Sequence, residues 1–106
     1  MIRVLEYLDP RGRSVYARWI EGLGHDAAAK VVEAVFRMSQ GNFSNVKSVG
    51  AGVLERRIDF GPGYRIYFGR DGEAVVILLG GSRKQDQQVE IAAARARWQD
   101  YRRRSR

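Results

Sequence analysis

The chain has 106 residues, of which 44% are hydrophobic, so it is long enough for one domain with a single core and too apolar to be disordered throughout. It has no cysteine, which excludes disulfides and thiolate metal sites, and its start carries no long apolar segment, so we expect a cytoplasmic protein without a membrane span. Nineteen Lys and Arg against twelve Asp and Glu give a net charge of +7. Because nearly all these cations are arginines, whose planar guanidinium suits phosphate, the chain is a candidate for nucleic-acid binding; a merely solvated arginine-rich surface is the alternative.

The first forty residues predict a strand followed by two helices. Residues 2–8 alternate loosely between apolar and polar side chains, as an opening strand does. Asp9 and Pro10 are typical of a helix start, which predicts a first helix from there to Gly24, and Asp26 is the predicted cap of a second helix. The apolar stripe of this second helix is formed by Val31, Ala34, Val35 and Met38, and Gly41 marks the end of the helix. We expect the two helices to form an antiparallel hairpin.

Residues 53–68, "VLERRIDFGPGYRIYF", predict a β-hairpin around the turn Gly61-Pro62-Gly63. A turn of these three residues would pair Ile58 with Ile66 and bring Asp59 opposite Arg65. Because side chains alternate along a strand, one face is expected to be core, formed by Leu54, Ile58, Phe60, Tyr64, Ile66 and Phe68. The other face is expected to display Glu55, Arg57, Asp59, Arg65 and Tyr67.

The remaining third of the chain predicts a buried strand and a final helix. The run "AVVILLGG", residues 74–81, suits a central strand that is buried on both faces. A helix is expected from about Gln85 to the arginine-rich end of the chain. The predicted order is β-α-α-β-β-β-α. It describes one α+β domain over residues 1–106, with a small mainly antiparallel sheet, a helical hairpin on one face and a C-terminal helix.

The polar face of the hairpin, with Arg83 and Lys84 at the end of the next strand, is the main candidate site. A metal site is not expected, since the only histidine, His25, lies in the turn between the helices. Two interpretations stay open for the polar face: cross-strand ion pairs at a solvated surface, or a clamp for phosphate. RNA cleavage without a metal needs an acceptor for the 2′-hydroxyl proton, cations for the phosphorane and an acid for the 5′-oxygen, which Glu, Arg, Tyr and Lys could supply.

Two segments carry a resemblance to a known family. "NVKSVGAGVLERRIDFGPGYRIYF" and "VVILLGGSRKQDQQVEIAAARARW" resemble the HigB-like "addiction module killer" branch of the RelE/ParE toxin superfamily. The resemblance implies a RelE-like fold and the toxin of a bacterial type II toxin–antitoxin system. It further implies inhibition of translation by a ribosome-dependent mRNA endonuclease that needs no cofactor. The alternatives are a ParE-like inhibitor of DNA gyrase and a nucleic-acid-binding domain with weakened catalysis.

The resemblance also implies roles for individual residues. Glu55 and Arg57 match the family's E-x-R, Arg65 matches the arginine of Y-R-x-Y, and Lys84 matches the basic residue after the di-glycine. Arg57 and Arg65 would hold the scissile phosphate, Glu55 would orient the 2′-hydroxyl or accept its proton, and Lys84 would stabilise or protonate the leaving oxygen. The expected substrate-binding residues are Tyr67, which would position a base, Arg83 and Lys47. No His or Tyr directly follows the last strand, where several relatives keep one, so the general acid stays open.

The expected partners follow from the same resemblance and from the charge. A toxin of this kind pairs with an antitoxin, here expected to be a helix-turn-helix protein that forms a hetero-oligomer with it. The basic patches, including the C-terminal arginines, are expected to contact mRNA and ribosomal RNA through phosphates.

Overall fold

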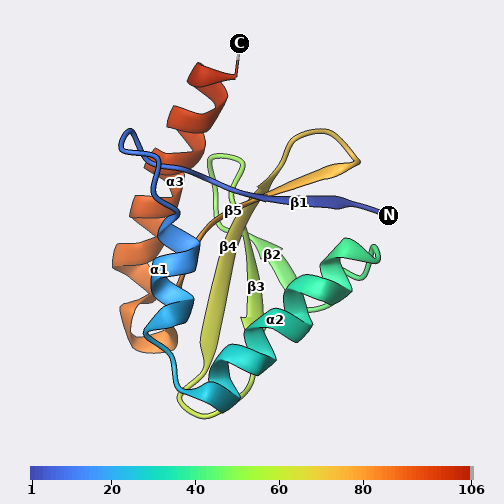
Figure 1. Ribbon diagram of the computed structural model, residues 1–106, viewed down its shortest axis with the longest axis vertical. Coiled ribbons are helices and arrows are strands. Elements are labelled where there is room, and N and C mark those ends of the chain that lie inside the picture. The colour runs from blue at the N-terminus through green and yellow to red at the C-terminus, as the bar shows by residue number, and fades with distance from the viewer. Residues whose placement is uncertain (106) are drawn as a thin grey trace.

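The computed structural model describes residues 1–105, which form a mixed α+β fold with a five-stranded sheet (Figure 1). The elements are β1 (Arg3–Glu6), α1 (Val15–Glu21), α2 (His25–Ser39), β2 (Val46–Ser48), β3 (Leu54–Ile58), β4 (Tyr64–Arg70), β5 (Val75–Arg83), a 3-10 turn η1 (Lys84–Asp86) and α3 (Gln87–Arg104). The strands lie in the order β1-β5-β4-β3-β2, and β1 pairs with β5 in parallel whereas the other neighbours are antiparallel. The predicted α+β class with a mainly antiparallel sheet and a C-terminal helix is therefore confirmed. None of the described helices is long and apolar enough to cross a membrane.

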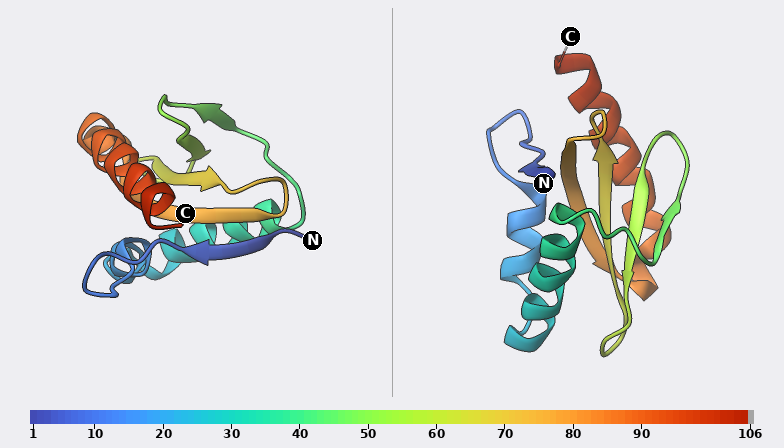
Figure 2. Two further views of the ribbon diagram at one scale, coloured as in Figure 1. Left: turned by 90° about the horizontal axis from the view of Figure 1, so that it is seen from above. Right: turned by 90° about the vertical axis from the view of Figure 1, so that its right-hand side faces the viewer.

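Helices cover both faces of the sheet (Figure 2), and each face carries a cluster of buried apolar side chains. On one face, α1 and α2 pack against the apolar side chains of the hairpin, including Ile66 and Phe68. On the other face, Ile91, Ala94 and Trp98 of α3 pack against Tyr67 and residues of β5. The expectation that the second face of the hairpin is displayed to solvent is therefore wrong over the part of the sheet that α3 covers.

The starts of both N-terminal helices differ from the prediction. The Asp9 carboxylate accepts hydrogen bonds from the backbone N–H of Arg11 and Arg13, at 2.9 and 3.0 Å, and closes a loop instead of capping a helix. The helix begins at Val15, where the Ser14 side chain accepts from the N–H of Ala17 at 3.0 Å. In α2 the N-cap is Gly24, and Asp26 lies in the first turn.

The hairpin of β3 and β4 has a longer loop than predicted. Ile58 pairs with Tyr64 and Arg57 with Arg65, so the predicted pairing of Ile58 with Ile66 is wrong by two residues. Because a shift of two residues keeps each side chain on its face, the predicted division into an apolar and a polar face holds. The short strand β2, which pairs with β3, was not predicted; its segment reads as a connection in the sequence.

Two glycines let large rings lie flat on the sheet. A Cβ atom at Gly69 would lie 2.4 Å from the Trp98 ring, and one at Gly81 would lie 2.4 Å from the Trp19 ring. Trp98 therefore fixes α3 on one face, and Trp19 fixes α1 on the other. Both contacts need a strand position without a side chain.

The two ends of the chain are joined by a polar cluster. The Tyr7 hydroxyl donates to the Asp100 carboxylate at 2.7 Å, and Arg104 lies 2.7 Å from the same carboxylate oxygen. Arg104 also donates to the carbonyl of Leu8 at 2.6 Å. The last turns of α3 are thus tied to the segment that follows β1.

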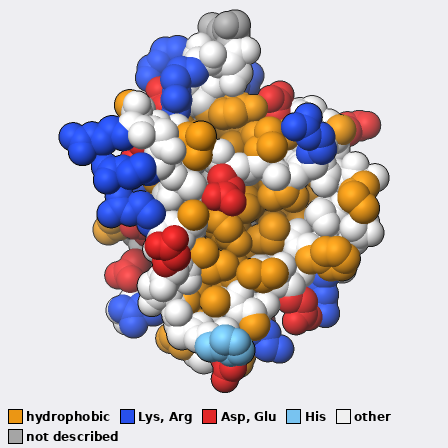
Figure 3. Space-filling model, in the orientation of Figure 1, with side chains coloured by type: hydrophobic (Ala, Val, Ile, Leu, Met, Phe, Trp, Pro, Cys, Tyr) orange, Lys and Arg blue, Asp and Glu red, His pale blue; other side chains and the backbone are white. Residues whose placement is uncertain are grey.

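One face of the molecule shows apolar side chains gathered at its centre and basic side chains along one edge (Figure 3). The exposed large apolar side chains of β1 and α2 are Leu5, Val32 and Phe36. The charge of the chain is therefore unevenly distributed over this face.

Candidate anion-binding site

Two arginines stand directly opposite each other where β3 and β4 approach the hairpin loop. Arg57 pairs with Arg65, on the sheet face that α3 partly covers, so the expected Asp59–Arg65 pair is wrong. Like charges in directly opposed positions repel, and the arrangement needs negative charge nearby. Part of it comes from Glu55, whose Oε1 lies 3.8 Å from Nε of Arg65.

Glu55 lies behind the arginines and has no exposed surface. Its Oε2 accepts a hydrogen bond from the side-chain amide of Gln87 at 2.8 Å, and its Oε1 lies 3.9 Å from Nζ of Lys47. A carboxylate buried in this way cannot touch a substrate in this arrangement. The structure therefore contradicts the expected contact with the 2′-hydroxyl, and Glu55 instead holds Arg65 in place.

Tyr67 is also fully buried, in the core beneath α3. Its hydroxyl lies 3.0 Å from Oγ of Ser82, within hydrogen-bond distance. Burial raises the pKa of Tyr67 to about 12, and the neighbouring Glu55 carboxylate adds to the rise. The expected role of Tyr67 in positioning a base is wrong for this structure, because no face of the ring is accessible.

The accessible part of the site is an open depression of about 500 Å³ beside the hairpin loop. It is lined by Arg57, Asp59, Phe60, Gly61, Pro62, Gly63, Arg65 and Lys84. Arg57 and Lys84 are exposed, and within residues 1–105 neither forms an ion pair. Three cations and one carboxylate therefore surround the depression, which suits a small anion such as a phosphate group.

Backbone geometry brings Lys84 next to the two arginines. The N–H of Lys84 donates to the carbonyl of Gly63 at 3.0 Å. Gly63 has a φ of 84°, and a Cβ there would lie 3.5 Å from both Arg65 and Lys84. Those contacts would be ordinary, so it is the left-handed backbone of the loop, and not a lack of space, that favours glycine at this position.

Asp59 is a site residue that sequence reasoning assigned to another role. It was expected to pair with Arg65, whereas the structure places it, exposed, on the depression. It is the only carboxylate among the lining residues. Its position directly before Phe60 and the Gly-Pro-Gly turn is the signal that could have identified it.

The remaining expected residues lie elsewhere. Lys47 is more than half exposed at the edge formed by β2. Arg83 pairs across the sheet with Tyr64, and its Nε lies 4.0 Å from Asp86 Oδ2. Arg57, Arg65 and Lys84 thus come together as expected, whereas Arg83 lines a different depression. Within residues 1–105, no group of three or more His, Cys, Asp or Glu side chains could hold a metal ion.

Comparison with known proteins shows a similarity to a protein that is itself uncharacterized. No family model matches the chain. Over 69 residues it is 42% identical to an uncharacterized protein of Haemophilus influenzae, a match that covers 65% of this chain and 70% of that protein. The chain belongs to the same family as this uncharacterized protein.

Proposed function

We propose that the chain is the toxin of a bacterial type II toxin–antitoxin system, a HigB-like member of the RelE/ParE superfamily that cleaves mRNA on the ribosome. The sequence resemblance described above supports this proposal. So does the order of elements, in which a strand and two helices precede a run of antiparallel strands and a C-terminal helix.

The observation that carries the proposal is the opposed pair Arg57 and Arg65 with Lys84 beside them. Glu55 offsets one of the three charges from behind, and Asp59 is the only carboxylate in front. A bound phosphate would relieve the repulsion between the arginines and accept hydrogen bonds from them. The arrangement therefore favours an anionic substrate over a purely structural network.

In the proposed reaction, the 2′-oxygen of a ribose forms a bond to the adjacent phosphorus while the bond from phosphorus to the 5′-oxygen breaks. The products are a 2′,3′-cyclic phosphate and a free 5′-hydroxyl. Arg57 and Arg65 stabilise the charge on the phosphorane oxygens, and the Lys84 ammonium donates a proton to the 5′-oxygen. Asp59 accepts the 2′-hydroxyl proton, since it is the carboxylate that lines the depression.

A second candidate function is a ParE-like binding inhibitor of DNA gyrase. The burial of Glu55 and Tyr67 favours it, because two of the expected reacting or substrate-contacting groups cannot touch a ligand. In this case, exposed arginines such as Arg57 would serve as contacts to a protein partner.

The proposed partners are an antitoxin, encoded as a helix-turn-helix protein, and ribosome-bound mRNA. The net charge of +7 supports both, since an acidic antitoxin and the RNA phosphates would each be attracted to this chain. We also propose that the protein acts in the cytoplasm, where ribosomes lie.

The test is expression without an antitoxin. We expect growth arrest, with breaks inside translated codons when mRNA ends are mapped by primer extension. Arg57→Ala should reduce cleavage by about a hundredfold, because it removes one preorganised charge from the phosphorane, and its melting temperature should stay near that of the wild type. Arg11→Ala, which changes an exposed arginine of the loop before α1, is the matched control and should remain toxic.

Growth arrest with intact mRNA and with stalled, cleaved DNA–gyrase complexes would contradict the endonuclease and favour the gyrase inhibitor. Full toxicity of Arg57→Ala would contradict the anion site itself. Comparing Asp59→Asn with Glu55→Gln then separates a direct role in proton transfer from a positioning role. Only Asp59→Asn should change the pH dependence of cleavage.

A further inference from the structure

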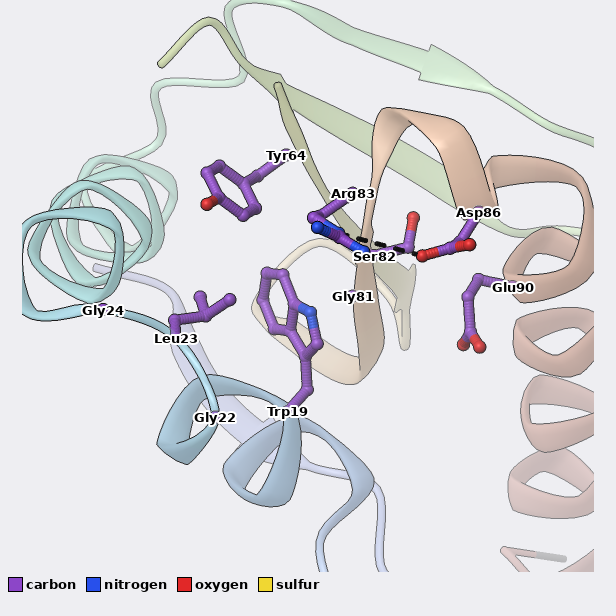
Figure 4. A pocket seen from close by; sticks show the side chains of 10 residues that line it. All are labelled: Trp19, Gly22, Leu23, Gly24, Tyr64, Gly81, Ser82, Arg83, Asp86 and Glu90. Atoms are coloured by element: carbon purple, nitrogen blue, oxygen red, sulfur yellow. Dashed lines mark ion pairs between the residues drawn. The ribbon is translucent and has the colours of Figure 1, made fainter. Parts of the chain in front are cut away.

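Figure 4 shows a second depression, of about 410 Å³. Its walls come from α1 and the turn after it, from the ends of β4 and β5, and from the start of α3. Its lining residues include Trp19, Leu23, Tyr64, Arg83, Asp86 and Glu90. The function proposed above makes no use of this depression.

The depression combines flat apolar walls with paired polar groups. Figure 4 shows the rings of Trp19 and Tyr64 facing the same hollow, with the Arg83 side chain reaching toward them and Asp86 and Glu90 on the other side. Trp19 is held rigidly, because its ring lies on the bare backbone of Gly81. Aromatic rings fixed in this way are suited to stacking on a planar ligand.

The two depressions are lined by residues that are neighbours in the chain. Gly63 and Lys84 line the anion-binding site, and their chain neighbours Tyr64 and Arg83 line the second depression. Tyr64 and Arg83 are partners across the strands, and Lys84 is hydrogen-bonded to Gly63. A strand of RNA with a phosphate at Arg57 and Arg65 would therefore place a neighbouring base in the second depression, against the half-buried ring of Trp19.

We propose that this depression is a nucleobase subsite that prefers guanine, an inference that rests on the proposed binding of RNA. Guanine carries two acceptors, O6 and N7, next to two donors, the N1–H and the 2-amino group. A guanidinium can donate to the first pair, and a carboxylate can accept from the second. Arg83 and Asp86 lie 4.0 Å apart and are both about half exposed, so they present these complementary groups side by side. Uracil has a smaller ring to stack and lacks this donor–acceptor pattern.

The experiment uses short single-stranded RNAs with 2′-O-methyl riboses, which cannot be cleaved: an oligouridylate, and the same strand with one internal guanosine. The chain has two tryptophans, so its ¹H–¹⁵N spectrum shows two indole signals, assigned with Trp19→Phe. We expect the guanosine strand to shift the Trp19 indole and the backbone signals around Gly63 and Lys84. The preference for guanosine should fall about fivefold or more in Arg83→Gln and stay unchanged in Arg11→Gln.

The two proposals fail in different ways. Shifts around Arg57 and Lys84 with an unmoved Trp19 indole would overturn the base subsite and leave the anion site standing. Equal affinity for both strands, unaffected by Arg83→Gln, would overturn the preference for guanine. The absence of all shifts would overturn the subsite and the anion site together.

Discussion

Arg65 contributes both to the candidate site and to the stability of the fold, whereas the sequence indicates only the first role. It lines the depression, and its side chain is only 7% exposed and lies against a carboxylate with no exposed surface. A buried ion pair of this kind contributes to stability mainly through the penalty for breaking it, since the remaining charge is left without a partner.

Arg65→Ala should therefore lower the free energy of unfolding by about 3–5 kcal/mol, in addition to any effect on activity. Adding Glu55→Gln should restore much of this loss, because the uncompensated negative charge is then gone. Denaturant melts of the single and double variants measure both effects. Arg57→Ala, which changes an exposed side chain, should stay within about 0.5 kcal/mol of the wild type. A double variant no more stable than Arg65→Ala would mean that Glu55 is not the group left unpaired.

The sequence predicted that Arg57, Arg65 and Lys84 lie together, but it did not predict which of the neighbouring side chains are buried. Period-two alternation and a turn signal were enough to place Arg57 and Arg65 on one face, and Lys84 followed from the resemblance. Burial of Glu55 and Tyr67 could not be predicted, because it depends on which part of the sheet α3 crosses. The alternation of apolar and polar residues along a strand carries no information about where a helix crosses the sheet.

At the scale of elements, the type of each element was easier to predict than its ends. The apolar stripe of α2 and the apolar run of β5 indicated a helix and a buried strand, and both are present. The start of α1 was wrong because Asp9 bonds to backbone groups in a loop as readily as at a helix cap. The hairpin register was wrong because five loop residues, 59–63, fit the same turn signal as three.

The contact between Gly69 and Trp98 constrains how α3 packs on the sheet. Gly69→Ala should destabilise the fold by about 1–3 kcal/mol, because the new methyl group would lie 2.4 Å from the ring and force the helix outward. Thermal and denaturant melts measure the loss. Gly22→Ala is the matched control: its backbone has ordinary helical angles and its new Cβ would make a normal 3.5 Å contact, so it should be neutral or slightly stabilising. Equal melting temperatures for the two variants would show that Trp98 can move without loss.

At the scale of the whole molecule, the cluster of Tyr7, Asp100 and Arg104 ties the two ends of the chain together. The hydrogen bond from Tyr7 lowers the pKa of Asp100 below its ordinary value, and Arg103 and Arg104 lower it further. Because the pKa of the folded protein is below that of the unfolded chain, the cluster stabilises the fold above about pH 4. This contribution is lost as the pH falls through the folded pKa.

Asp100→Asn should therefore melt at a lower temperature than the wild type at neutral pH, and the difference should shrink below about pH 4. Thermal melts of both proteins across this range provide the measurement. Asp71→Asn changes an exposed carboxylate that accepts a hydrogen bond from Tyr101 of α3, and it serves as the comparison. A difference that does not vary with pH would contradict the role of the Asp100 charge.

The parallel pairing of β1 with β5 has a consequence for how the chain acquires its structure. Residues 3–6 hydrogen-bond to residues 75–78, so about seventy residues separate strands that lie side by side. A parallel pair cannot form through a tight turn, and the entropy of closing so long a loop must be met before the pairing is gained. The strands β2 to β5, by contrast, are neighbours both in sequence and in the sheet. During synthesis, β1 leaves the ribosome well before its partner β5, so it is among the last of the five strands to be paired, after the strands around the candidate anion-binding site have their local partners.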